Sequence, residues 1–199
     1  MSEPDEEGLR AEDQLLARAK AGDQDALETI FETYRNQVFS LAFRMTGNTS
    51  DAEDLTQEVF LQVMRKIGSF QGRSSFSTWL YRVTVNRSRD YLRSKKRNPE
   101  LLSQDGGGAG PRDDIYASAS TPAPESSAIS SEAQRIVQEA LMELPINLRA
   151  PLVLHELEGL EYHQVARMLR LPVGTVKSRI FRGRLKLAEL LEHHKEQWR

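Results

Sequence analysis

The sequence predicts an all-α protein in which two small helical domains are joined by a flexible linker. Apolar residues recur every three or four positions in both halves, and alternating β-branched runs are almost absent. A stretch rich in glycine, proline and serine separates the halves. We place the N-terminal domain at residues 13–97, the linker at 98–130 and the C-terminal domain at 131–195.

Four apolar stripes predict the helices of the N-terminal domain. The first begins near Leu15, and the others cover 26–45, 50–67 and 75–97. Ser50 has the spacing of a capping box with the glutamate three positions later, so we expect the third helix to begin there.

The C-terminal domain is predicted by four shorter stripes, at 131–144, 148–157, 161–169 and 174–193. A second capping box starts at Ser131, and a proline at 145 ends the first of these helices.

Charge is distributed unevenly along a chain whose net charge is only −2. Residues 71–97 carry eight basic side chains against one acid, and residues 173–187 carry five basic side chains and no acid. Two cationic segments on a slightly acidic chain indicate two separate phosphate-binding surfaces. The alternative is that both are solvated helix faces without a partner.

The pattern from Leu160 to Leu187 is typical of a helix-turn-helix. A short helix with the small Ala166 on its apolar face is followed by a tight connection and a second amphipathic helix. Such turns favour glycine, and Arg170 stands near that place. The polar and basic side chains that share the outer face are Thr175, Ser178, Arg179, Arg182 and Lys186. The candidates for contacting duplex DNA are Thr175, Lys177, Ser178, Arg179 and Arg182. The alternative is a helical hairpin with a basic surface.

Aromatic, basic and amide groups alternate between residues 70 and 93, a mixture that suits single-stranded DNA. Aromatic faces stack on unpaired bases, cations follow phosphates, and an amide reads a base edge. The candidates are Phe70, Arg73, Phe76, Trp79, Arg82, Asn86 and Arg89. Trp79 and Tyr91 could instead belong to the core.

Acidic residues gather at the start of the predicted third helix. Asp51, Asp54, Gln57 and Glu58 form a block that either is a solvated first turn, favoured by the helix dipole, or docks on a basic surface of a partner protein.

Several function classes are disfavoured by composition. The absence of cysteine excludes disulfides and thiolate metal sites and suits a reducing cytoplasm. The acidic start is unlike a signal peptide, and no apolar run approaches the length of a membrane span. The four histidines have no metal-binding spacing, and the glycine run precedes no helix, so we expect no metal, no cofactor and no catalysis.

At this point two blocks of the chain resemble a known family, the extracytoplasmic-function group of RNA polymerase sigma factors. The block from Phe43 to Tyr91 is similar to sigma region 2, through the sequences DAEDLTQEVF at 51–60 and FSTWLYRVTVN at 76–86. The block from Leu144 to Leu187 is similar to sigma region 4, through PVGTVKSR at 172–179. The short chain, without regions 1 and 3, indicates the extracytoplasmic-function group.

The resemblance implies a role for each candidate set. The acidic helix around Asp54 would dock on the clamp helices of the largest polymerase subunit, and the flap of the second-largest subunit would be a further contact. The stretch from Phe70 to Asn86 would recognise and help melt the −10 element of promoter DNA. The helix from Thr175 would read the −35 element. A cytoplasmic location, no stable membrane insertion and control by an anti-sigma factor are also implied.

The two promoter elements would lie about 60 Å apart, whereas a free linker has a root-mean-square span of about 30 Å. The polymerase must therefore supply the spacing, and we expect the free chain to bind promoters poorly. The main rival is a conventional regulator that binds duplex DNA through the C-terminal domain, with a sensing or dimerising N-terminal half.

Overall fold

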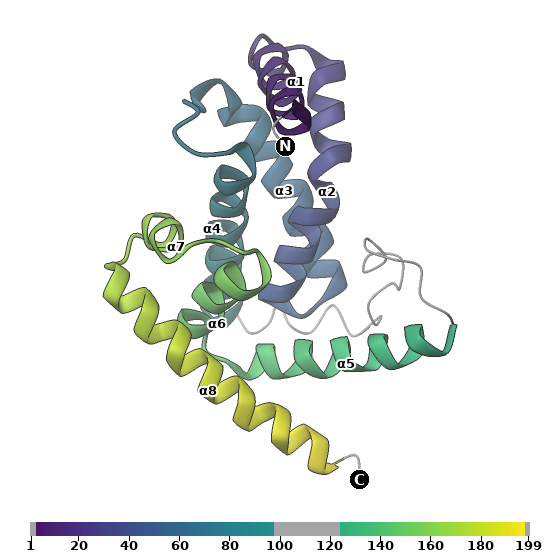
Figure 1. Cartoon of the computed structure of the whole chain (residues 1–199), viewed down its shortest axis with the longest axis vertical. Coiled ribbons are helices and arrows are strands. Elements are labelled where there is room, and N and C mark those ends of the chain that lie inside the picture. The colour runs from purple at the N-terminus through teal and green to yellow at the C-terminus, as the bar shows by residue number, and fades with distance from the viewer. Residues whose placement is uncertain (1–2, 98–123, 198–199) are drawn as a thin grey trace.

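A computed structural model of the chain describes residues 3–97 and 124–197, and within these ranges every regular element is a helix (Figure 1). Side chains are described for 11–97 and 132–193. The all-α prediction is confirmed. Most of the predicted linker, 98–123, lies outside the described residues.

The N-terminal domain contains four α-helices and a short 3₁₀ helix. They are α1 (Glu3–Lys20), α2 (Gln24–Thr46), α3 (Thr49–Lys66), η1 (Ile67–Ser69) and α4 (Phe76–Arg97). Helix α2 begins where the Asp23 carboxylate accepts the Ala26 N–H. It ends at Gly47, whose φ of 73° lies in the left-handed region, and whose N–H donates to the Phe43 carbonyl at 2.8 Å.

The predicted starts of two helices are wrong. Helix α3 begins at Thr49 rather than Ser50, because the Asn48 side chain accepts the Asp51 N–H at 2.9 Å and acts as the cap. Helix α5 begins at Pro124, well before the capping box predicted at Ser131. A proline is tolerated in the first turn of a helix because the N–H it lacks would have no partner there.

The C-terminal domain is built from α5 (Pro124–Glu143), α6 (Ile146–Leu152), η4 (Val153–Leu157), α7 (Tyr162–Leu169) and α8 (Val173–Gln197). Helix α6 contains Pro151, which cannot donate a backbone hydrogen bond. The chain then continues as the wider π-helical turn η4, which ends at Leu157 and has Glu158 as its C-cap.

Three clusters of buried apolar residues form the core of the described chain, and the smallest joins Phe43 of α2 to Leu55 of α3. In the first large cluster, the aromatic side chains between residues 60 and 79 pack with Ile30 of α2, Val59 of α3 and Leu80 of α4. The second cluster gathers α5 to α8, and Leu41 and Met45 of α2 belong to it. Helix α2 therefore contributes side chains to the core of its own domain and to the core of the C-terminal domain.

The helix-turn-helix is formed by α7 and α8. Glu161 and Gln164 make a reciprocal capping box at the start of α7. Arg170 ends this helix with φ 56° and ψ 49°, the left-handed conformation that favours glycine. Leu171 N–H then donates to the Ala166 carbonyl at 2.9 Å, which closes the turn. The tight turn predicted from the sequence is therefore present, with an arginine in the glycine position.

Because a non-glycine residue is destabilised by about 1–2 kcal/mol in this conformation, replacing Arg170 with Gly should raise the free energy of unfolding by about 1 kcal/mol. Urea titration followed by circular dichroism measures the change. Arg170→Ala is the matched control, since alanine meets the same backbone strain and should give no such gain. A glycine variant that is no more stable than the alanine variant would contradict the assignment of strain.

Candidate nucleic-acid interface

Helix α8 presents its polar face outward because its apolar face is fixed against α6. Val176 and Ile180 are fully buried. Gly183 lies over α6, where a Cβ atom would be 3.5 Å from the Leu148 carbonyl oxygen and 3.6 Å from Leu152. These are ordinary van der Waals distances, so α8 packs closely on α6 at Gly183, and the register places the opposite face in solvent.

The outer face of α8 carries the five residues predicted to read DNA. Lys177, Ser178 and Arg182 are exposed, and Thr175 and Arg179 are half-buried. Lys177 lies 5.4 Å from the centre of the Tyr162 ring, so its cation is supported by α7. The Ser178 hydroxyl donates to the Thr175 carbonyl at 3.0 Å, and Arg182 Nε donates to the Ser178 carbonyl at 3.3 Å. These contacts hold the polar groups along the helix.

Arg184 belongs to the same basic segment but has a different environment. Its guanidinium donates to Glu156 at 2.8 and 2.5 Å, which ties α8 to η4. This ion pair separates Arg184 from the candidate DNA-reading set.

Helix α4 presents a second polar face, made by Arg82, Asn86 and Arg89 at spacings of four and three residues. Arg82 and Asn86 are exposed, and Arg89 is half-buried. Within the described ranges, none of these side chains forms an ion pair or a side-chain hydrogen bond. Arg73 is exposed in the loop before α4. The described structure therefore leaves four groups of the predicted set available to a ligand.

The predicted base-stacking aromatics lie beneath this face and pack on one another. The ring centres of Phe70, Phe76 and Trp79 are each 5.6 Å apart. Phe76 is only 1% exposed and also meets Tyr34 edge to face. In this arrangement Phe76 supports α4 from within the core. The alternative interpretation of Trp79 as a core residue also agrees with its burial.

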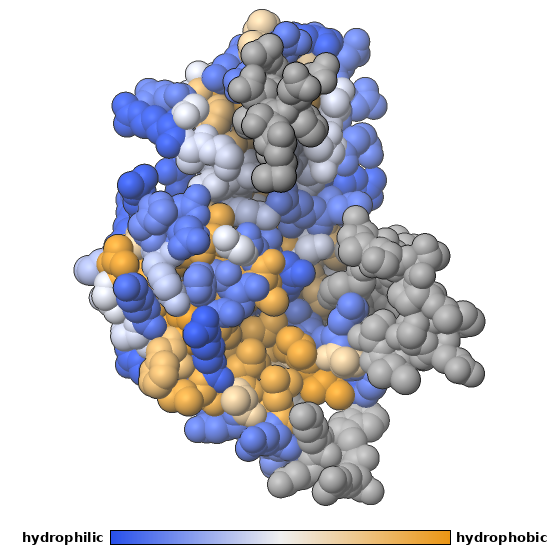
Figure 2. All heavy atoms as spheres, viewed as in Figure 1, coloured by the Kyte–Doolittle hydropathy of each residue, from blue (hydrophilic) through white to orange (hydrophobic). Residues whose placement is uncertain are grey.

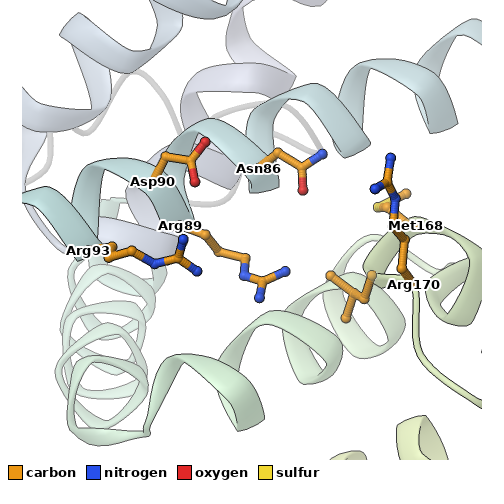
Figure 3. Close-up of a pocket in the computed structure, with 7 residues that line it drawn as sticks. Asn86, Arg89, Asp90, Arg93, Met168 and Arg170 are labelled. Atoms are coloured by element: carbon orange, nitrogen blue, oxygen red, sulfur yellow. The ribbon is translucent and has the colours of Figure 1, made fainter.

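Two clefts separate the polar face of α4 from α7. One, of about 340 Å³, lies between Arg82 of α4 and Arg167 of α7. The other, of about 350 Å³, is lined by α4 residues including Asn86 and by Arg170 from the end of α7. In Figure 3, Arg89 and Arg93 extend from α4 on one side of this cleft and Arg170 rises on the other. The candidate −10 surface thus faces the C-terminal domain across clefts whose charged lining residues are mostly arginines.

The acidic block on α3 divides into two parts. Asp54, Gln57 and Glu58 are exposed, and Glu58 forms an ion pair with Arg87 of α4. Asp51 is only 6% exposed. Its carboxylate accepts a hydrogen bond from the Tyr91 hydroxyl at 2.6 Å and one from Lys95 Nζ at 2.9 Å. Asp51 therefore joins α3 to α4, and the other three side chains face outward.

Two exposed apolar residues lie beside this block, and the sequence pattern alone did not predict their exposure. Leu61 is 52% exposed and Met64 is 55% exposed. Leu61 lies four and seven residues after Gln57 and Asp54, so it shares their side of α3. The spacing of Met64 fits both the buried and the exposed face. The sequence signal that could have predicted this exposure is an apolar residue at helical spacing from the acidic positions.

Within the described residues, no cluster of three acidic or histidine side chains has the arrangement of a metal site. Across the same part of the chain, none of the helices combines the length and apolar character of a transmembrane span.

Two helical domains with exposed basic residues on α4 and α8, the second domain containing a helix-turn-helix, are typical of a DNA-binding protein. Residues 30–98 match Sigma-70 region 2, and residues 134–187 match Sigma-70 region 4. The ECF RNA polymerase sigma-E factor of Haemophilus influenzae is 38% identical over 177 residues, with 85% of this chain and 89% of that protein covered. The factor SigW of Bacillus subtilis is 36% identical over 176 residues, with 88% and 94% covered. The chain belongs to the extracytoplasmic-function family of RNA polymerase sigma factors.

Solved structures agree with this assignment. The sigma factor RpoE of Bartonella quintana, solved with the anti-sigma factor NepR, superposes with a TM-score of 0.61 at 25% identity and covers 83% of this chain and 96% of its own. CnrH, solved with the cytosolic domain of CnrY, has the same fold, with a TM-score of 0.60 at 23% identity and coverage of 90% and 96%.

The burial of Asp51 predicts a structural role that Asp54 does not share. Asp51→Asn should lower the free energy of unfolding by about 1–3 kcal/mol, because it leaves Lys95 without its carboxylate partner. Asp54→Asn is a matched control near the same helix end and should change stability by less than about 0.5 kcal/mol. Urea titrations of both variants provide the comparison, and equal effects would show that the Asp51 contacts contribute nothing specific.

Proposed function

We propose that this protein binds core RNA polymerase, directs it to specific promoters by reading the −10 and −35 elements, and helps melt the DNA at the start of transcription. The observation that carries the proposal is the pair of polar, cationic helix faces on α4 and α8, one in each sigma region. Each face has its apolar side fixed in a core, and each presents groups that bind phosphates and base edges.

Helix α8 reads the −35 element as duplex DNA. A helix-turn-helix places the start of its second helix in the major groove, where Lys177 and Arg179 reach guanine O6 and N7. Thr175, Ser178 and Arg182 lie on the same outer face and complete the contact.

The polar face of α4 binds the −10 element in its melted form. Arg73, Arg82 and Arg89 follow the phosphates, and the Asn86 amide reads an unpaired base. The aromatic cluster of Phe70, Phe76 and Trp79 supports this face, and Phe70 and Trp79 stack on bases only at their exposed edges.

The outer side of α3 docks on the clamp helices of the largest polymerase subunit. Asp54, Gln57 and Glu58 supply charge and hydrogen bonds, and the exposed Leu61 and Met64 add apolar area beside them. An interface with an apolar centre and a polar rim is the arrangement found in specific protein complexes.

The C-terminal domain docks on the flap of the second-largest subunit. Figure 2 shows apolar groups gathered over α5 and α8, and Phe181 and Leu185 of α8 are exposed. Exposed apolar surface of this kind marks a protein–protein interaction site. The same surfaces suit an anti-sigma factor, the partner with which the similar RpoE structure was solved.

The protein acts without catalysis of its own, as a DNA-binding subunit in the cytoplasm, where the polymerase and promoter DNA meet. The rival proposal, a regulator that binds duplex DNA unaided, predicts specific binding without core enzyme. Run-off transcription with purified core enzyme distinguishes them: we expect a specific transcript only when both components are present. The absence of any specific transcript would overturn the sigma-factor proposal.

Replacing Lys177 or Arg182 with Ala should weaken −35 recognition by about 1–3 kcal/mol for each base that the variant can no longer touch. Competition between promoters with intact and scrambled −35 elements, bound by the polymerase complex, measures the effect. Arg184→Ala removes the same charge from the same helix but only breaks the pair with Glu156, so it should keep the discrimination. Full discrimination by the Lys177 and Arg182 variants would show that another face of α8 reads the DNA.

Reversing two charges on α3, with Asp54→Lys and Glu58→Lys, should reduce binding to core enzyme about tenfold or more by placing like charges at the interface. Affinity for core enzyme is measured by pull-down titration. The control carries Glu28→Lys and Glu32→Lys, two exposed glutamates at the same spacing on α2. If the control binds core enzyme as weakly as the α3 variant, net charge rather than the α3 surface governs the interaction.

A further inference from the structure

Lys177 occupies an electrostatically unfavourable place near the start of α8. It is the fifth residue of this helix, and the first turn contains no acidic side chain. Because helical side chains lean toward the N-terminus of their helix, the lysine extends toward the first turn, whose partial positive charge disfavours a cation. Within the described residues, no carboxylate forms an ion pair with Lys177. Its charge therefore needs another partner.

The partner that the structure provides is an aromatic ring of the preceding helix. Lys177 Nζ lies over the Tyr162 ring, 5.4 Å from its centre. The face of an aromatic ring carries partial negative charge and attracts a cation within about 6 Å of its centre. An ammonium group has three N–H donors, so a ring on one side leaves donors for a base. The contact joins the first residue of α7 to the start of α8.

The Tyr162 ring is itself fixed by its neighbours. It is half-buried and packs against the core of the C-terminal domain. The His155 imidazole stacks on the ring, with 4.2 Å between the ring centres and 30° between the planes. His155 in turn donates from Nδ1 to the Leu160 carbonyl at 2.7 Å, which ties the imidazole to the backbone before α7. A rigid aromatic platform therefore lies beside the start of α8.

A lysine gains more from such a platform than the arginines of the same face do. Its charge is a compact group on a flexible four-carbon stem, and fixing that stem costs conformational entropy. Arg182 has local support, because its Nε donates to the Ser178 carbonyl of its own helix. An ammonium that is placed before DNA arrives loses less entropy when it contacts a base. The ring can thus act on DNA recognition without touching DNA.

We propose that Tyr162 is a positioning residue for the reading of the −35 element. Its ring holds the Lys177 ammonium at the start of α8, and His155 holds the ring. The base pair that Lys177 contacts is therefore discriminated by α7 and α8 together. This effect on DNA rests on the proposed function of α8, whereas the placement of Lys177 by the ring does not.

Proton nuclear magnetic resonance on the full chain tests the placement. An aromatic ring moves the resonances of protons over its face upfield. The ε-methylene protons of Lys177 should therefore lie upfield of those of Lys186, which pairs with Glu189 instead of a ring. Tyr162→Phe should keep this shift, Tyr162→Leu should abolish it, and His155→Ala should reduce it. A shift that is absent from the unmodified chain, or that survives Tyr162→Leu, would overturn the placement. A shift unchanged by His155→Ala would overturn the role of His155.

A promoter series tests the effect on DNA. Each −35 base pair is changed in turn, and the polymerase complex is bound in competition with the intact promoter. Lys177→Ala identifies the base pair that this lysine reads. Tyr162→Leu should reduce discrimination at that same base pair about two- to fivefold, and Tyr162→Phe should preserve it. Combined with Lys177→Ala, the leucine change should cause no further loss, because both changes remove one contact.

Two results would overturn the positioning role. One is an additive loss in the double variant, and the other is a loss spread evenly over all −35 positions, which indicates general damage to the domain. If Lys177→Ala alters discrimination at no position, the proposed function of this lysine fails, while the resonance shifts still decide its placement by the ring.

Discussion

The structure depends on helix α2 being buried along two sides. Ile30 and Val38 pack with α3 and α4, and Leu41 and Met45 pack with the C-terminal helices. A helix enclosed in this way transmits the position of one domain to the other, because its apolar side chains cannot leave either core without exposure to water. The cationic faces of α4 and α8 are oriented by the same packing.

Much of the architecture could be predicted from the sequence, because helix periodicity and stop signals are local. The apolar spacing at 174–193 predicted an amphipathic helix, and in the structure Val176, Ile180 and Gly183 form the inward face of α8. The start of α3 was misplaced because both Asn48 and Ser50 are residue types that cap helices, and Asn48 has the required geometry. Helix α5 begins at Pro124, inside the segment whose composition predicted a linker.

Contacts between residues that are far apart in the sequence could not be predicted in the same way. Asp51 differs from Asp54 only through Tyr91 and Lys95, which lie 40 and 44 residues further along the chain. The packing of the domains on each other was missed for a similar reason. Glu158 and Arg44, which pair across the domains, are 114 residues apart, and a composition typical of a linker carries no information about contacts between the segments that it joins.

Gly47 meets two structural requirements at one position. Its left-handed φ ends α2, and its missing side chain admits Met142 of α5. Any larger residue would strain the backbone at this positive φ, and its Cβ would displace the flexible Met142 side chain. A substitution at position 47 should therefore disturb both the end of α2 and its packing on α5, although the residue lies away from the DNA-reading faces and from the polymerase-docking side of α3.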